Sequence, residues 1–234
     1  TYTKDRRAYE CWSDGNIHAA NQFMGSPYFD GISADHIGPI SLGFVHDPRY
    51  LQPMEGGDNS SKRDRLQLGD IEKILETERR TMVYPMSWYS KEIWEFIKSN
   101  YRSNTHKIGS IYRDALKQNM ANFMYILWYI LKRCPITGES FLIGAFLEPN
   151  FACFNYSYSF DGNGEIVEQI PRHFTDRSKK ETERYCRIAI NAVYDYRNKG
   201  NRNTAPYLTS AEKASLEKIC GSINSGFPVN IIKQ

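Results

Sequence analysis

The spacing of apolar residues changes near residue 135, and this change constrains the fold more than any other feature of the chain. Before it, apolar residues recur at helical spacing over 70–80, 90–101 and 108–133, where we expect helices. After it, polar and aromatic residues alternate along 151–160, which predicts a strand. We therefore expect an α+β fold with a helical middle.

Turn and cap signals predict the remaining elements. Asp161-Gly162-Asn163-Gly164 is typical of a hairpin turn, so we expect a return strand at 165–170. The apolar run 141–147 also predicts a strand. The Asp58–Ser61 cluster indicates a helix start, because such side chains accept hydrogen bonds from first-turn amides. Further helices are expected at 17–23, 181–197 and 210–223.

Composition excludes several classes of protein. Hydrophobic residues make up 41% and charged residues 24% of the 234 residues, which argues against wholesale disorder. The longest apolar run, around 123–131, is shorter than the roughly 20 residues of a membrane-spanning helix, so no membrane partner is expected. The net charge of +3 does not by itself indicate a nucleic-acid binder.

The cysteines argue against disulfide bonds and structural zinc. Five are scattered along the chain with no C-x-x-C pair: Cys11, Cys134, Cys153, Cys186 and Cys220. No basic-then-apolar leader opens the sequence. We therefore expect a reducing, cytoplasmic setting.

One segment combines residues suited to phosphodiester hydrolysis. Asp35-His36 ends a short predicted strand, and apolar residues 50–54 and then Asn59 follow it. An imidazole accepts a proton from water near neutral pH. Carboxylate and amide oxygens, as in Asp35 and Asn59, suit Mg²⁺ or Mn²⁺. Three cations close the segment: Lys62, Arg63 and Arg65.

Each of these residues also has an ordinary explanation. An Asp-His pair is commonly a loop hydrogen bond, Asn59 suits a helix cap, and the three cations suit a solvated helix face. These residues occur in one order around a strand–loop–strand–helix pattern, and this joint occurrence favours the functional interpretation. His46 lies in the loop between the two predicted strands, where we expect an exposed residue. The alternative is that the His46 side chain approaches the candidate site.

A basic stretch lies near the C-terminus. Residues 172–202 carry nine basic and four acidic side chains. A solvated helix face and a surface that binds the DNA backbone both remain open as interpretations. The candidates for DNA contact are Arg177, Lys179, Lys180, Arg184 and Arg187.

Three stretches resemble the HNH, or ββα-metal, nuclease motif: Asp35-His36-Ile37-x-Pro-x-Ser, Leu51-Gln52-Pro53 and Asn59-Ser60-Ser61-Lys62. This resemblance covers about residues 31–68. The wider sequence over 28–44 and 175–191 is similar to the BsaI-like group of type IIS restriction endonucleases.

The resemblance implies a role for each residue of the motif. His36 would be the general base, Asp35 and Asn59 the ligands of Mg²⁺ with Mn²⁺ as a substitute, and Lys62 would face a phosphate. Tyr50 stands where the motif has its middle Asn, which steadies the loop that holds the base. Residues 54–58 lack the zinc-binding cysteines of many members, so no zinc is expected.

The expected organisation follows from this motif. Residues 1–30 would be a lead-in, 31–70 a ββα-metal nuclease unit, and 71–234 a helical scaffold with a hairpin and a DNA-contact surface. The expected activity is metal-dependent cleavage of double-stranded DNA, with a homodimer on DNA as a plausible assembly. If the chain is only the cleavage part, the region that recognises the DNA sequence lies upstream.

Two alternatives remain. The first is a DNA-binding module with a degenerate HNH unit that does not cut, for which Tyr50 in the Asn position is the best support. The second is an RNA-directed nuclease with the same motif.

Overall fold

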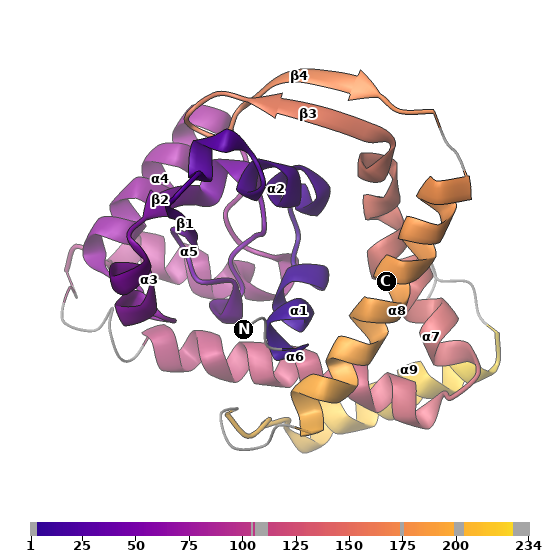
Figure 1. Ribbon diagram of the computed structural model, residues 1–234. Helices are drawn as coiled ribbons and strands as arrows, with labels where there is room; N and C mark the ends of the chain where they lie inside the picture. Colours follow the sequence, from indigo (N-terminus) through magenta and orange to yellow (C-terminus); the bar gives the residue numbers. More distant parts are fainter. Residues whose placement is uncertain (1–3, 104, 106–111, 174–175, 199–203, 227–234) are drawn as a thin grey trace. The chain divides into compact units, whose positions relative to one another are not determined.

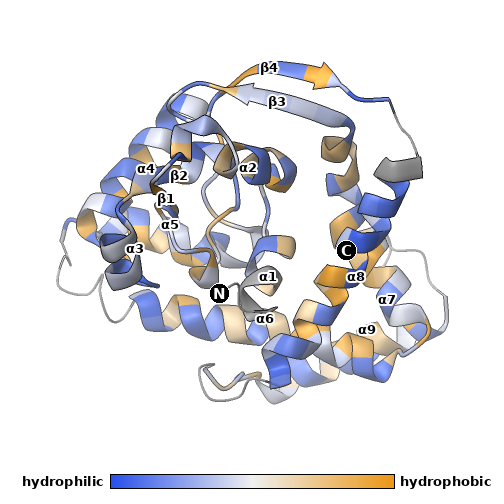
Figure 2. Ribbon diagram, viewed as in Figure 1, coloured by the Kyte–Doolittle hydropathy of each residue, from blue (hydrophilic) through white to orange (hydrophobic). Residues whose placement is uncertain are grey.

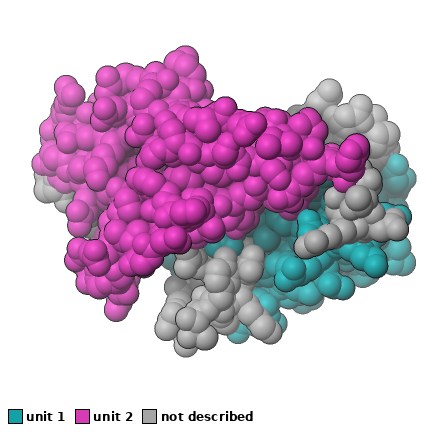
Figure 3. Space-filling view, turned by 45° about the horizontal axis from the view of Figure 1, so that its top comes forward, with its two compact units in different colours: residues 1–12, 118–152, 174–234 teal, residues 13–117, 153–173 magenta. Residues whose placement is uncertain are grey.

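The structure is a computed structural model that describes residues 4–103, 105, 112–173, 176–198 and 204–226. Its contacts divide the chain into two compact units (Figure 3). Unit 1 comprises residues 1–12, 118–152 and 174–234, and unit 2 comprises residues 13–117 and 153–173.

Unit 1 is helical in its described residues. Its α-helices are α1 (Lys4–Cys11), α6 (Arg113–Arg133, which begins in unit 2), α7 (Thr137–Leu142), α8 (Asp176–Asn198) and α9 (Ser210–Asn224) (Figure 1). A π-helical turn (Ile143–Leu147) and a 3₁₀ segment (Glu148–Asn155) follow α7. Helix α1 packs against α8, and α7 packs against α9. The indole of Trp12 donates to the carbonyl of Ala189 at 2.9 Å, which fixes the end of α1 on α8.

Unit 2 combines helices with two small antiparallel sheets. Its elements are α2 (Ile17–Met24), β1 (Ser33–His36), β2 (Leu51–Met54), α3 (Gly56–Lys62), α4 (Leu68–Thr81), α5 (Lys91–Asn100), β3 (Tyr156–Phe160) and β4 (Ile166–Pro171). Strand β1 pairs with β2, and β3 pairs with β4. The fold class is therefore confirmed as a mostly helical α+β fold.

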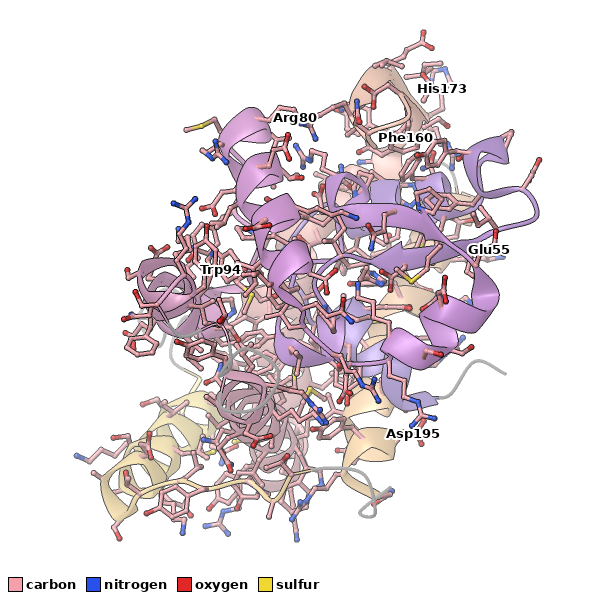
Figure 4. All side chains as sticks on the ribbon, turned by 90° about the vertical axis from the view of Figure 1, so that its left-hand side faces the viewer. Glu55, Arg80, Trp94, Phe160, His173 and Asp195 are labelled. Atoms are coloured by element: carbon pink, nitrogen blue, oxygen red, sulfur yellow. The ribbon has the colours of Figure 1, made fainter. Side chains whose placement is uncertain are left out.

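The main core of unit 2 joins α4 and α5 to the segment between β1 and β2. Ile71 and Ile74 of α4 and Trp94 of α5 are fully buried there. Figure 4 labels Trp94, whose ring meets Phe44 edge-on with centroids 5.6 Å apart. The helical spacing of the apolar residues in 70–101 follows from this burial.

A second, smaller cluster connects α2 to the β3–β4 hairpin. Phe23 is buried with its ring 4.9 Å from that of Phe160. The amide of Gln22 donates to the Tyr156 carbonyl and accepts from the Tyr158 amide, at 3.1 and 3.0 Å. These bonds satisfy backbone groups at an edge of the hairpin.

Most expected elements are confirmed, with shifted ends. Helices expected at 17–23, 70–80, 90–101, 181–197 and 210–223 correspond to α2, α4, α5, α8 and α9, although α8 begins earlier. Of the helix expected at 108–133, the structure describes 112–133, where α6 confirms it; residues 108–111 lie outside the described ranges. The hairpin at 161–164 is confirmed.

The strand expected at 141–147 is wrong, because these residues are helical. Leu142, Ala145 and Leu147 are almost fully buried, so the run is apolar around much of a helix. A short, continuously apolar run does not distinguish a strand from a buried helix. Residues 151–155 are likewise 3₁₀-helical, and the expected strand begins only at Tyr156.

Two properties expected from composition can be compared with the structure. No helix in the described ranges combines the length and the apolarity needed to cross a membrane. All five cysteines carry free thiols.

Candidate active site

The site is built on the β1–β2 ribbon and on α3. Asp35 pairs with Gln52 across the ribbon, and His36 pairs with Leu51. Glu55, labelled in Figure 4, lies between the end of β2 and the start of α3. Helix α3 packs against β1. The chain therefore follows the order strand, strand, helix around Asp35.

The carboxylate of Asp35 is buried and held on one side. Its Oδ2 accepts from the Lys62 ammonium at 2.6 Å and from the Gln52 amide at 2.9 Å. Gln52 is fixed in turn, since its Oε1 accepts from Lys73 at 3.0 Å. Within the described residues, Oδ1 of Asp35 makes no hydrogen bond. One carboxylate oxygen thus remains for another ligand.

Lys62, the last residue of α3, directs its ammonium into the protein. Besides the Asp35 bond, the Nζ donates to the carbonyls of His36 and Ile37, each at 2.9 Å. The carboxylate of Asp70 lies 3.5 Å away. A buried charge is tolerated when it is paired and hydrogen-bonded, and Lys62 satisfies both conditions. In the structure this ammonium holds Asp35, and the expected contact with a phosphate stays a prediction.

His36 contacts a second histidine. Its Nε2 lies 2.8 Å from Nδ1 of His46, and both rings are buried. The His46 amide donates to the Ser13 hydroxyl and to the Asp14 carbonyl, both at 3.2 Å. The exposed position expected for His46 is therefore wrong. The apolar Phe44-Val45 pair directly before it was the sequence signal that this loop runs through the interior.

Tyr50 anchors the ribbon in the place where the motif has Asn. Its hydroxyl donates to the Val83 carbonyl at 2.5 Å, and its own carbonyl accepts from the Ile37 amide at 3.0 Å. Burial, together with the nearby carboxylates of Glu78 and Asp47, raises the pKa of the Tyr50 phenol well above its usual value. The phenol therefore remains a neutral hydrogen-bond donor.

Asn59, Arg63 and Arg65 leave their side chains partly or fully open to solvent. The Asp58–Ser61 cluster does not begin the helix as expected: α3 begins at Gly56, with Glu55 as its N-cap, so Asn59 lies inside it. Within the described residues, the Asn59 side chain makes no hydrogen bond. Arg63 and Arg65 follow the helix and are exposed. Asn59 is thus not a helix cap.

A family model described as Type II restriction endonuclease (RE_Alw26IDE) matches residues 1–232. The chain belongs to this family. Membership implies an endodeoxyribonuclease, a hydrolase whose substrate is DNA. No curated protein matches the chain, and no solved structure matches it.

The restriction endonuclease carries its other candidate cations on α8, in unit 1. Lys179, Lys180, Arg184 and Arg187 are exposed, while the side chain of Arg177 lies outside the described part of the chain. Residues 180, 184 and 187 follow i, i+4, i+7 spacing and share one helix face. Figure 2 colours this first part of α8 hydrophilic and the middle of the helix hydrophobic. In α8 these exposed basic residues therefore come before the buried residues in the sequence.

Proposed function

We propose that this type II restriction endonuclease cleaves double-stranded DNA through an HNH (ββα-metal) unit formed by β1, β2 and α3. The observation that carries the proposal is the position of Asp35-His36 at the end of β1, with α3 packed on the same strand. His36 would act as the general base. Two strands must be cut, so we propose that two copies of the chain act on one duplex.

The donor set around Asp35 fits a divalent cation with oxygen ligands. Oδ1 of Asp35 would supply one oxygen ligand, and the Asn59 amide, on the helix packed against β1, would supply the other. Mg²⁺ retains several waters and needs few protein ligands. The described residues contain no group of three His, Cys, Asp or Glu side chains suited to a metal ion. An ion held by the two oxygen ligands of Asp35 and Asn59 does not need such a group. When bound, the ion supplies charge stabilisation at the scissile phosphate.

The residues of the chain supply the remaining chemistry. His36 takes a proton from water as the water oxygen attacks phosphorus. Lys62 and Gln52 hold the Asp35 carboxylate by its other oxygen. Arg63 and Arg65, exposed after α3, would contact DNA phosphates, and such contacts position a duplex without reading its sequence.

The test is plasmid cleavage. Supercoiled plasmid is incubated with the protein and Mg²⁺, Mn²⁺ or EDTA, and nicking is followed on a gel. We expect metal-dependent nicking, and we expect His36→Ala to lower the rate by about 10²–10⁴-fold with DNA affinity retained. His173→Ala is the matched control, because His173 is an exposed histidine of unit 2.

Three results would contradict the proposal. Near-normal cutting by His36→Ala would show that His36 is not the general base. Cutting that is unaffected by EDTA would show that the reaction does not require a metal ion. Tight DNA binding without any cutting, under every metal condition, would favour the degenerate binding module; preferential cutting of RNA would favour the RNA-directed nuclease.

A further inference from the structure

Unit 1 contains a cavity of about 190 Å³ between α6, α8 and the segment that precedes α9. Figure 1 shows the C-terminal part of α8 beside α6, where this cavity lies. Its walls include Tyr125 of α6, Tyr196 and Arg197 of α8, and residues 204–206. An apolar cavity of about 150 Å³ in a protein can bind a benzene molecule, so this one has room for a single aromatic ring of that size.

Contacts within unit 1 hold the walls of this cavity. The Tyr196 ring is only 7% exposed, and it meets the Tyr9 ring edge-on with centroids 5.8 Å apart. The segment before α9 is bonded to α6, because the Gln118 amide donates to the Ala205 carbonyl at 2.9 Å. The cavity is therefore formed before any ligand binds, which lowers the cost of ordering the site.

Aromatic rings and cations meet on the part of α6 that borders the cavity. The rings of Tyr125 and Trp128 are partly exposed and lie 5.6 Å apart. The Arg197 guanidinium lies over both rings, 5.6 and 5.3 Å from their centroids. The Lys132 ammonium also lies over Trp128, at 4.9 Å. A guanidinium stacked on rings in this way presents its N–H donors in a fixed plane.

These residue types fit an unpaired nucleobase. Aromatic side chains beside cations bind unpaired bases, because every base has a π-face and its backbone carries negative charge. The family to which the chain belongs acts on DNA. We propose that the cavity binds one unpaired base of a DNA strand, which stacks on Tyr125 and accepts hydrogen bonds from Arg197. This proposal does not depend on His36 as the general base.

A second copy of the chain is the other partner to consider for this face. Tyr, Trp and Arg are also enriched at the centres of protein–protein interfaces. A symmetric dimer would, however, place the same basic face of both copies against each other, and like charges repel. The size of the cavity and the charge beside it therefore favour the base.

Two DNA duplexes that differ in one base test the proposal. One duplex carries an unpaired thymidine in one strand, and the other carries an abasic residue at the same position, so the two have the same charge. Affinity for each is measured by fluorescence anisotropy in EDTA. Stacking of one base on aromatic side chains changes affinity by roughly 5- to 150-fold, and we expect the wild type to prefer the thymidine duplex by such a factor.

Variants of the cavity walls identify the residues that cause this preference. We expect Tyr125→Leu to abolish it and Tyr125→Phe, which keeps the ring, to retain it. Arg197→Lys keeps the charge but loses the planar group, so the preference should fall. Phe96→Leu is the control, because Phe96 is an exposed aromatic residue of unit 2. The preference is a ratio of two affinities of one variant, so a partly unfolded sample does not imitate its loss.

Three results would overturn the proposal. The first is equal affinity of the wild type for the two duplexes, and the second is an unchanged preference in Tyr125→Leu. The third is a dimer, detected by light scattering, that Tyr125→Leu dissociates while no base preference is found; this face would then be an interface between copies. The assay does not use cleavage. Near-normal cutting by His36→Ala would therefore contradict the proposed function and leave this result unchanged.

Discussion

A single lysine joins three segments of unit 2. The Lys62 ammonium of α3 bonds the carboxylate of Asp35 on β1 and lies 3.5 Å from that of Asp70 on α4. Its side chain is only 7% exposed, so removing the cation leaves a buried carboxylate without its charge partner. Breaking a buried ion pair in this way costs about 3–5 kcal/mol.

We therefore expect Lys62→Met to lower the free energy of unfolding by about 3–5 kcal/mol, measured by urea denaturation. Arg65→Met is the control: the same chain carries an exposed cation three residues later, where we expect a change of about 0.5 kcal/mol or less. Adding Asp35→Asn to Lys62→Met should recover part of the loss. Equal stability of the Lys62 and Arg65 variants would show that the buried pair contributes nothing.

The sequence was informative about which residues matter and less so about what they touch. The order Asp35, His36, Asn59 and the strand–strand–helix arrangement around them follow from local patterns. The partners of these side chains do not. Lys62 reaches Asp35 across 27 positions, and the His46 amide bonds Ser13 and Asp14, more than 30 positions earlier in the chain. Long-range packing of this kind leaves little trace in local spacing.

The β3–β4 hairpin offers a test of one element against the rest of unit 2. Gly164 in its turn has a φ of +74°, and a Cβ there would lie 2.2 Å from the carbonyl oxygen of Pro48. A side chain would therefore force the turn away from the segment that precedes β2. Gly162, two residues earlier, would meet only a carbon of Tyr28 at an ordinary 3.5 Å.

We expect Gly164→Ala to lower the free energy of unfolding by about 1–3 kcal/mol, because it adds backbone strain and a steric overlap. Gly162→Ala should change it by about 0.5 kcal/mol or less. Thermal or urea unfolding of the two variants, side by side with the wild type, makes the comparison. Indistinguishable variants would mean that the turn is not held against Pro48 in solution.

Elements with both a periodic pattern and an end signal were predictable. Helix α9 is the clearest case: Thr209 and Glu212 form a capping box at its start, and Leu216, Cys220 and Ile223 give it a buried face. The 141–147 run has no such signal. Its apolar residues are equally compatible with a strand and with a buried helix. The structure has a helix here, and α7 packs against α9.

The division into two units depends on contacts between distant segments. Residues 153–173 belong with 13–117 because Gln22 of α2 pairs with β3 and Phe23 packs on Phe160. No change in composition marks the boundary inside α6. The division has a functional counterpart in the proposal: His36 and Asp35 belong to unit 2, and the basic face of α8 belongs to unit 1.

Binding and chemistry should therefore be separable by mutation. If Lys179 and Lys180 lie along DNA phosphates, their cations release condensed counterions, and the logarithm of affinity falls with the logarithm of salt concentration by about 0.9 per phosphate. We expect Lys179→Glu with Lys180→Glu to flatten that slope by up to about 2 and to weaken binding to all sequences alike. The cleavage rate at saturating protein should be unchanged, since in this proposal these residues position the duplex and take no part in the chemistry.

The matched control makes the same charge change on another helix of unit 1. Lys213 and Lys218 are exposed on α9, and reversing both alters the net charge of the chain equally. Binding is measured by fluorescence anisotropy over a series of salt concentrations. If the α8 and α9 variants lose affinity and slope to the same extent, only net charge matters and α8 is not a DNA-contact surface. If the α8 variant binds as tightly as the wild type, its lysines belong to a solvated helix face.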